Sequence, residues 1–205
     1  MDHLKEKIIP HMGDSGHGLD HVERVYNLAV RIAKQEKVDL DTVNAASLLH
    51  DIARRIESKT GKCHAEEGAK MAIPILKEIN FPEDKLQNVI HCIKVHRYSK
   101  GLNAETKEAK ILQDADRLDA IGAIATARIL EVGISKGNIL HDPTIKPREI
   151  YDGSTSTIIN HFFEKILKIK PETFHTKLAK EIAGERYDLT EKFVKKFIKE
   201  WEGKA

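Results

Sequence analysis

The stretch Ala45-Ala46-Ser47-Leu48-Leu49-His50-Asp51-Ile52-Ala53 places a histidine and an aspartate side by side within an apolar run. Apolar residues from Leu40 to Ala53 cover almost every face of a helix, which is typical of a helix buried on all sides. A buried imidazole and a buried carboxylate are unfavourable unless something pairs with them. A divalent cation is one such partner, because neutral imidazole and ionised carboxylate both ligate metals. Hydrogen bonds to other buried side chains are the alternative.

Helical periodicity continues on both sides of this stretch. Apolar residues recur at helical spacing from Val22 to about residue 36, and a polar turn over 37–41 then leads into the buried helix, which we expect to reach Arg55. A loop is expected over 57–62, and no segment shows the alternating pattern of a strand. The sequence therefore predicts an all-α fold. Further helices are predicted over about 64–78, 82–97, 109–130, 154–168 and 171–202, with a long surface loop over 131–151.

The composition is typical of a globular protein with a real core. The chain has 205 residues, 40% of them hydrophobic, a net charge of +2 and only 5% aromatic residues. Interleaved charges and few aromatic residues argue against nucleic-acid binding. No apolar run approaches the roughly 20 residues of a membrane span, and the N-terminus lacks an apolar targeting segment. Cys63 and Cys92 are far apart in the sequence, which is typical of free thiols in a reducing compartment. We therefore expect a cytoplasmic protein that does not bind membranes.

Three segments place imidazole and carboxylate groups where they can meet. His21 lies near the start of the first long helix, and His50 and Asp51 end the buried one. Because a short link makes these two helices antiparallel neighbours, we expect the three residues to come together. The segment Gln113–Asp119 offers acids within another apolar helix. Asp116 lies on the apolar surface of that helix and requires a partner.

His21, then His50-Asp51, then Asp116, resemble the H…HD…D signature of the HD-domain superfamily of metal-dependent phosphohydrolases. The resemblance covers about residues 15–130. The region 160–186 also resembles the C-terminal part of a stand-alone bacterial and archaeal branch. The resemblance implies an HD-domain helical bundle with additional C-terminal helices. We expect a single domain over 1–205, with a core at about 15–130 and a C-terminal helical extension at about 150–205.

The resemblance also implies one divalent metal ion, held by His21, His50, Asp51 and Asp116. Two imidazoles with two carboxylates suit Mn²⁺, Fe²⁺, Co²⁺, Ni²⁺ or Zn²⁺ more than Ca²⁺, and Mg²⁺ stays open. The implied reaction is hydrolysis of a phosphate ester or anhydride, on a nucleotide or a similar small phosphorylated molecule, by attack of metal-bound water. Asp51 would serve both as a ligand and as the base that orients this water.

Other residues are candidates for contacts with the phosphate. His64 and His96 match positions that help to hold a second metal in some HD proteins, but Arg97 stands where the dinuclear branch has a further histidine. We therefore expect one metal, with His64 and His96 as phosphate ligands or general acids, or else as ordinary, partly exposed histidines. Arg24 could grip a phosphate or pair with Asp20 on the surface. Further candidates for substrate binding are His17, Lys165 and Arg186.

Arg54 and Arg55 directly follow the His-Asp pair. Cations are favourable at the C-terminal end of a helix, because they complement its dipole. We therefore expect both arginines to be solvated and to take no part in catalysis.

Two rival functions come from other classes. One is a non-catalytic protein that binds a nucleotide as a sensor. The other is an oxygenase with two irons, which requires a filled second metal site. The sequence leaves open whether a phosphohydrolase of this kind would act as a nucleotidase, a pyrophosphohydrolase or a phosphodiesterase, and whether the chain forms a homodimer.

Overall fold

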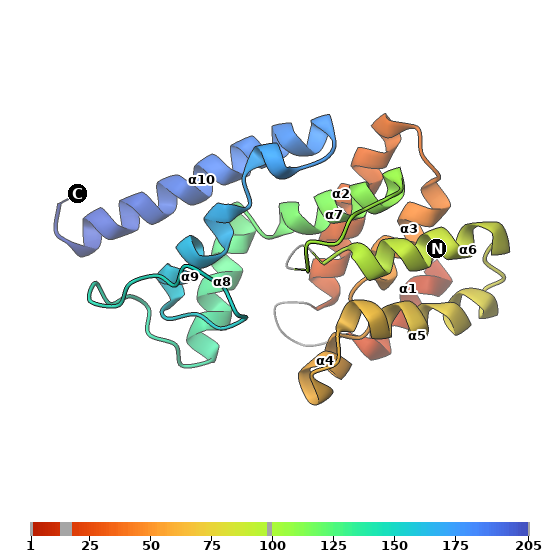
Figure 1. The fold of residues 1–205 in the computed structure, drawn as a ribbon, viewed down its shortest axis with the longest axis horizontal. Helices are drawn as coiled ribbons and strands as arrows, with labels where there is room; N and C mark the ends of the chain where they lie inside the picture. Colours follow the sequence, from red (N-terminus) through yellow and green to blue (C-terminus); the bar gives the residue numbers. More distant parts are fainter. Residues whose placement is uncertain (1, 13–17, 98–99, 205) are drawn as a thin grey trace. The chain divides into compact units, whose positions relative to one another are not determined.

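The structure is a computed structural model that describes residues 2–12, 18–97 and 100–204 (Figure 1). The chain divides into two compact units, Met1–Arg117 and Leu118–Ala205. Over the described ranges, the regular elements are α-helices and short 3-10 helices, with no strand. The predicted all-α fold is therefore confirmed. That the whole chain acts as a single domain stays a prediction.

The first unit is organised around the buried helix α3. In this unit, α3 packs against α2 and α6, and α5 packs against α6. Val43, Ala45, Ala46, Leu48 and Leu49 of α3 are buried, as expected for a helix surrounded by others. The elements are α1 (Asp2–Ile8), η1 (Ile9–His11), α2 (Leu19–Glu36), α3 (Leu40–Leu49), α4 (Arg54–Thr60), α5 (His64–Glu78), α6 (Glu83–Val95) and most of α7 (Lys107–Asp119).

The buried helix ends at Leu49, so the prediction that it reaches residue 55 is wrong. The Nδ1 of His50 donates to the carbonyl oxygen of Ser47 at 2.7 Å. In a continuing helix, that carbonyl would accept the backbone N–H of Asp51. Residues 50–53 form a turn instead, and α4 covers part of the segment predicted to be a loop. The turn leaves His50 and Asp51 buried beside α3.

The second unit begins at the end of α7, where the sequence predicts a continuous helix over 109–130. That prediction is wrong, because α7 and α8 are separated at Gly122, whose φ of +95° and ψ of −166° are accessible essentially to glycine alone. The N–H of Gly122 donates to Oγ1 of Thr190 at 2.8 Å. The other elements are α8 (Ala123–Ser135), α9 (Ile158–Glu164), η3 (Ile166–Lys168), η4 (Pro171–Thr173) and α10 (Lys177–Trp201).

Replacing Gly122 by Ala is expected to destabilise the protein by about 1–3 kcal/mol, because alanine is strained at this φ and ψ. A Cβ there would also lie 3.0 Å from Cγ of Arg186. Gly184, inside α10, is the matched control, since a Cβ at that position meets nothing within 4 Å. Gly184→Ala should stabilise the helix by about 0.5–1 kcal/mol. Urea denaturation measures both changes, and a Gly122→Ala protein as stable as the wild type would contradict the argument.

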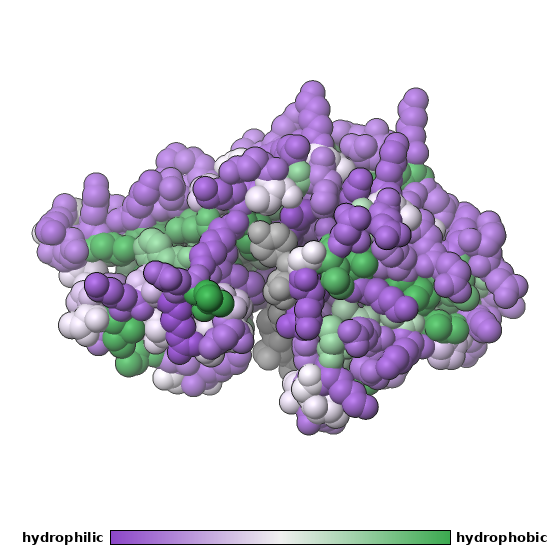
Figure 2. Space-filling model, viewed as in Figure 1, coloured by the Kyte–Doolittle hydropathy of each residue, from purple (hydrophilic) through white to green (hydrophobic). Residues whose placement is uncertain are grey.

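The surface is largely polar. Figure 2 shows hydrophilic side chains over most of the visible face, with apolar patches between them. None of the helices in the described residues combines the length and the apolar character that crossing a lipid bilayer demands.

Candidate metal centre

Four of the predicted site residues come together inside the first unit. His21 comes from α2, His50 and Asp51 from the turn after α3, and Asp116 from α7. The Nε2 of His21 lies 3.3 Å from Nε2 of His50, 3.5 Å from Oδ2 of Asp51 and 3.5 Å from Oδ1 of Asp116. The Nε2 of His50 lies 3.7 Å from the same Oδ2 of Asp51. Residues separated by up to 95 positions in sequence thus lie close to Nε2 of His21.

The cluster is buried on one side and reaches the surface on the other. His21, His50 and Asp51 are at most 1% exposed. The side chain of Asp116 is 19% exposed. Of these four residues, Asp116 is therefore the one through which the cluster meets solvent.

Within this cluster, His50 is neutral and Asp116 is ionised, which are the forms in which these two groups ligate a metal. The Nδ1 of His50 donates to the carbonyl oxygen of Ser47, so the neutral ring presents the lone pair of Nε2 to the cluster. Burial lowers the pKa of His50 to about 4, although the charge of Asp51 opposes this shift. Burial by itself would raise the pKa of Asp116, but the hydrogen bond and the charge of His21 outweigh it and bring the pKa well below its usual value.

These donor atoms fit a divalent cation. Nitrogen and oxygen ligands about 2.1 Å from an ion, in tetrahedral or octahedral arrangement, lie about 3.0–3.5 Å from one another. The observed separations of 3.3, 3.5 and 3.7 Å are close to this range. His21, His50 and Asp51 also form a group whose ligand atoms all lie within 4.8 Å of one another, so that they could hold a metal ion.

Asp51 also belongs to a second group, with His64 and His96, that could hold a metal. The Nε2 atoms of these two histidines are 3.2 Å apart and lie 3.3 and 3.5 Å from Oδ1 of Asp51. The Nδ1 of His96 donates to the carbonyl oxygen of Ile93, and Nδ1 of His64 donates to Oε2 of Glu57, each at 2.7 Å. Both histidines are fully buried, so the alternative that they are partly exposed is wrong.

Arg54 lies against this second group, which corrects the expectation that it is solvated. Its Nε lies 2.8 Å from Oδ1 of Asp51, and its Nη1 donates to Oε2 of Glu57 at 3.2 Å. Because α4 begins at Arg54, the side chain lies beside the preceding turn and not at the end of a longer helix. Arg97 also donates to Glu57, through Nη1 at 2.6 Å. The spacing of three residues between Asp51 and Arg54, common in helical ion pairs, is the sequence signal that could have found this contact.

The other predicted substrate contacts lie outside these two groups or outside the described residues. The Nη1 of Arg24 donates to Oδ2 of Asp20 at 2.7 Å, so the surface pair is formed. His17 lies outside the described residues. Contact of Arg24 and His17 with a phosphate stays a prediction.

Lys165 and Arg186 belong to the second unit. The Nζ of Lys165 lies 5.2 Å from the centre of the Tyr151 ring, a cation–π distance. The Nη1 of Arg186 donates to the carbonyl oxygen of Leu118 at 2.6 Å, where α7 ends. Their roles in substrate binding stay predictions.

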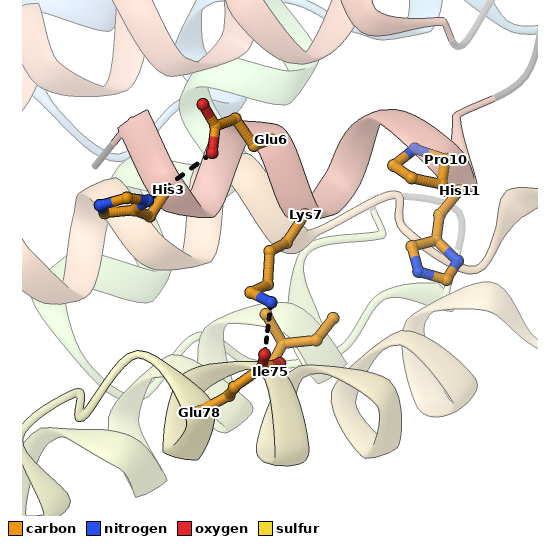
Figure 3. Close-up of a pocket in the computed structure, with 7 residues that line it drawn as sticks. All are labelled: His3, Glu6, Lys7, Pro10, His11, Ile75 and Glu78. Atoms are coloured by element: carbon orange, nitrogen blue, oxygen red, sulfur yellow. Dashed lines mark hydrogen bonds and ion pairs between the residues drawn. The ribbon is translucent and has the colours of Figure 1, made fainter.

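A separate hollow of about 530 Å³ lies between the N-terminal helical segment and α5 (Figure 3). An ion pair between Lys7 and Glu78 bridges it. The hollow contains no residue of the two histidine and aspartate groups, so we do not place the active site there. Its lining residues are His3, Glu6, Lys7, Pro10, His11, Ile75 and Glu78.

An all-α fold with a buried cluster of histidines and aspartates is expected of a metal-dependent hydrolase of the HD type. Residues 18–121 match the HD domain, and the chain belongs to this family. The predicted resemblance to the HD-domain superfamily is confirmed. The protein is a metal-dependent phosphohydrolase in this general sense.

Individual relatives are similar over nearly the whole chain, and one of them is an HD-superfamily hydrolase. YpgQ of Bacillus subtilis, an uncharacterised protein, is 33% identical over 193 residues, covering 92% of this chain and 86% of YpgQ. The crystal structure of YpgQ in complex with ADP has a TM-score of 0.73 at 28% identity, over 100% of this chain and 99% of that one. An HD-superfamily hydrolase from Bacillus thuringiensis has a TM-score of 0.75 at 32% identity, over 98% and 96% of the two chains. A protein from Lactobacillus plantarum has a TM-score of 0.81 at 33% identity, over 98% and 95%.

Proposed function

We propose that this protein hydrolyses a phosphate ester or anhydride of a nucleotide, or of a similar small phosphorylated molecule, with one divalent metal ion held by His21, His50, Asp51 and Asp116. The observation that carries this proposal is the set of donor atoms, two imidazole nitrogens and two carboxylate oxygens, with neighbouring atoms 3.3–3.7 Å apart. The complex of YpgQ with ADP supports a nucleotide as the substrate class. A bound divalent ion polarises a phosphoryl group and lowers the pKa of water.

Asp51 has the central role in the proposed reaction. Its Oδ2 faces His21 and His50, and its Oδ1 faces His64 and contacts Arg54. A carboxylate held from both sides keeps one orientation, which is what a group that positions an attacking water needs. We therefore propose Asp51 as the base that orients this water.

The remaining candidates would act on the phosphate. His64 and His96 contact Oδ1 of Asp51. We therefore propose that protons pass between these imidazoles and the reacting groups through the Asp51 carboxylate, or that the imidazoles neutralise phosphate charge beside it. Arg24 could exchange its bond to Asp20 for a phosphate oxygen, because guanidinium binds both anions in the same forked geometry. His17, Lys165 and Arg186 are proposed as further substrate contacts.

The most informative test is a substrate panel assayed with several added divalent metals. It should contain phosphomonoesters, nucleoside polyphosphates and cyclic nucleotides. We expect turnover of at least one nucleotide, loss of turnover after chelation, and recovery with Mn²⁺, Co²⁺ or a similar ion. If the metal-loaded protein hydrolysed no member of the panel, the proposed activity would be refuted, and a nucleotide sensor would become the better hypothesis.

A dinuclear iron oxygenase remains the second candidate, because Asp51, His64 and His96 form a second group that could hold a metal. Iron analysis of protein purified without oxygen separates the two functions. Two irons per chain would favour oxygenase chemistry, and one divalent ion per chain would favour hydrolysis.

A further inference from the structure

The two carboxylate oxygens of Asp51 have different surroundings. Oδ2 lies 3.5 Å from Nε2 of His21 and 3.7 Å from Nε2 of His50. Oδ1 lies 3.3 Å from Nε2 of His64 and 2.8 Å from Nε of Arg54. A cationic side chain therefore contacts the oxygen that a second metal ion would need.

The guanidinium of Arg54 is held in this position by a second acid. Its Nη1 donates to Oε2 of Glu57, and the same oxygen accepts from Nδ1 of His64. The other oxygen of Glu57 accepts from Arg97. Because arginine is not deprotonated in proteins, this side chain is always cationic.

A second divalent ion between Asp51, His64 and His96 would share Oδ1 with this guanidinium. Two cations on one oxygen repel each other strongly in a buried site, because little water is present to screen them. Glu57 is already paired with Arg54, Arg97 and His64, so its charge is compensated within the network. The group that could hold a second metal thus already contains a fixed positive charge.

We propose that Arg54 takes the place of a second metal ion, so that the chain binds one divalent ion, and that Arg54 acts as a positioning residue for Asp51. This inference rests on the proposed metal site of His21, His50, Asp51 and Asp116. It also changes the reason for expecting one metal. The sequence argument relied on Arg97, whereas the structure places Arg97 on Glu57 and Arg54 on Asp51 itself.

The test counts metal ions and does not depend on activity. The full chain is stripped with a chelator, reloaded with Mn²⁺, desalted and analysed for manganese per chain. We expect one Mn²⁺ in the wild type and two in Arg54→Gln, with the second ion binding at least about 100-fold tighter than in the wild type. In Arg54→Gln, electron paramagnetic resonance should show two coupled Mn²⁺ ions that share Asp51.

Two controls define the position of the second ion. Arg55→Gln removes the neighbouring arginine of α4, which is exposed and donates to the carbonyl oxygen of Pro10, and it should leave the count at one. Adding His64→Ala to Arg54→Gln should return the count from two to one. Arg54→Met, which keeps the side-chain length without the charge, repeats the test with another variant, and thermal melts establish that each protein is folded.

The outcomes separate this inference from the proposed function. Two Mn²⁺ of similar affinity in the wild type would overturn the role of Arg54 and leave the proposed metal site intact. One Mn²⁺ in folded Arg54→Gln or Arg54→Met would do the same. A wild-type protein that binds no divalent ion would instead contradict the metal site itself.

Discussion

Replacing Asp51 by Ala is expected to lower kcat/KM by at least about 10³-fold and to prevent metal binding, because a metal ion contributes several kcal/mol to such a reaction. Asp51 is the one carboxylate shared by both histidine groups. Its removal would take away the carboxylate oxygen that lies 3.5 Å from His21 and 3.7 Å from His50, and it would release Arg54 from its contact at 2.8 Å. Both metal affinity and the orientation of water should therefore be lost together.

Steady-state kinetics on the best substrate of the panel, together with metal analysis, measures this effect. Asp51→Asn keeps the shape of the side chain and separates loss of charge from loss of packing. Asp84→Ala, in the exposed first turn of α6, is the matched control and should keep wild-type kinetics and metal content. Wild-type turnover by Asp51→Ala would mean that the cluster is not the catalytic centre.

Adding Mn²⁺ to chelated protein is expected to raise the Tm by about 8–16 °C. A ligand that binds only the folded state adds about 4.1 kcal/mol when its concentration is 1,000 times its Kd. For a chain of this size, each kcal/mol shifts the Tm by about 2–4 °C. The physical reason is the buried cluster, in which donor atoms of His50, Asp51 and Asp116 lie 3.3–3.5 Å from Nε2 of His21.

Calorimetry with and without the metal measures this shift. Asp116→Ala should lose most of it, because that variant lacks the acid 3.5 Å from His21. Ca²⁺ should shift the Tm less than Mn²⁺, since Ca²⁺ prefers ligand sets made of oxygen alone. An equal rise in Asp116→Ala and in the wild type would show that the stabilising ion binds somewhere else.

Much of the fold could be predicted from local patterns. The helix over 64–78 has the predicted bounds, and the helix predicted from the apolar spacing between Val22 and about residue 36 ends at Glu36. Asp39, in the predicted polar turn over 37–41, caps the buried helix by accepting from the N–H of Thr42. Such features depend on residues within a few positions of one another, so a sequence pattern contains them.

The features that could not be predicted depend on side chains that compete with the backbone or arrive from distant elements. The ring of His50 donates a hydrogen bond to the carbonyl oxygen of Ser47, where the buried helix ends. Its last residue is Leu49, six residues earlier than the expected residue 55. The break at Gly122 uses the hydroxyl of Thr190, a residue 68 positions further along the chain. Periodicity alone contains no information on either contact.

The sequence by itself determined the all-α class and the four residues, His21, His50, Asp51 and Asp116, that come together. Apolar periodicity and a short link between antiparallel helices were sufficient to bring His21, His50 and Asp51 together, because they set which helix ends are neighbours. The resemblance to the HD signature added Asp116. Only the tertiary structure decided which group lies on Oδ1 of Asp51. Its position there depends on how the chain turns between α3 and α4, and a buried hydrogen bond from the His50 ring to Ser47 lies at the start of that turn.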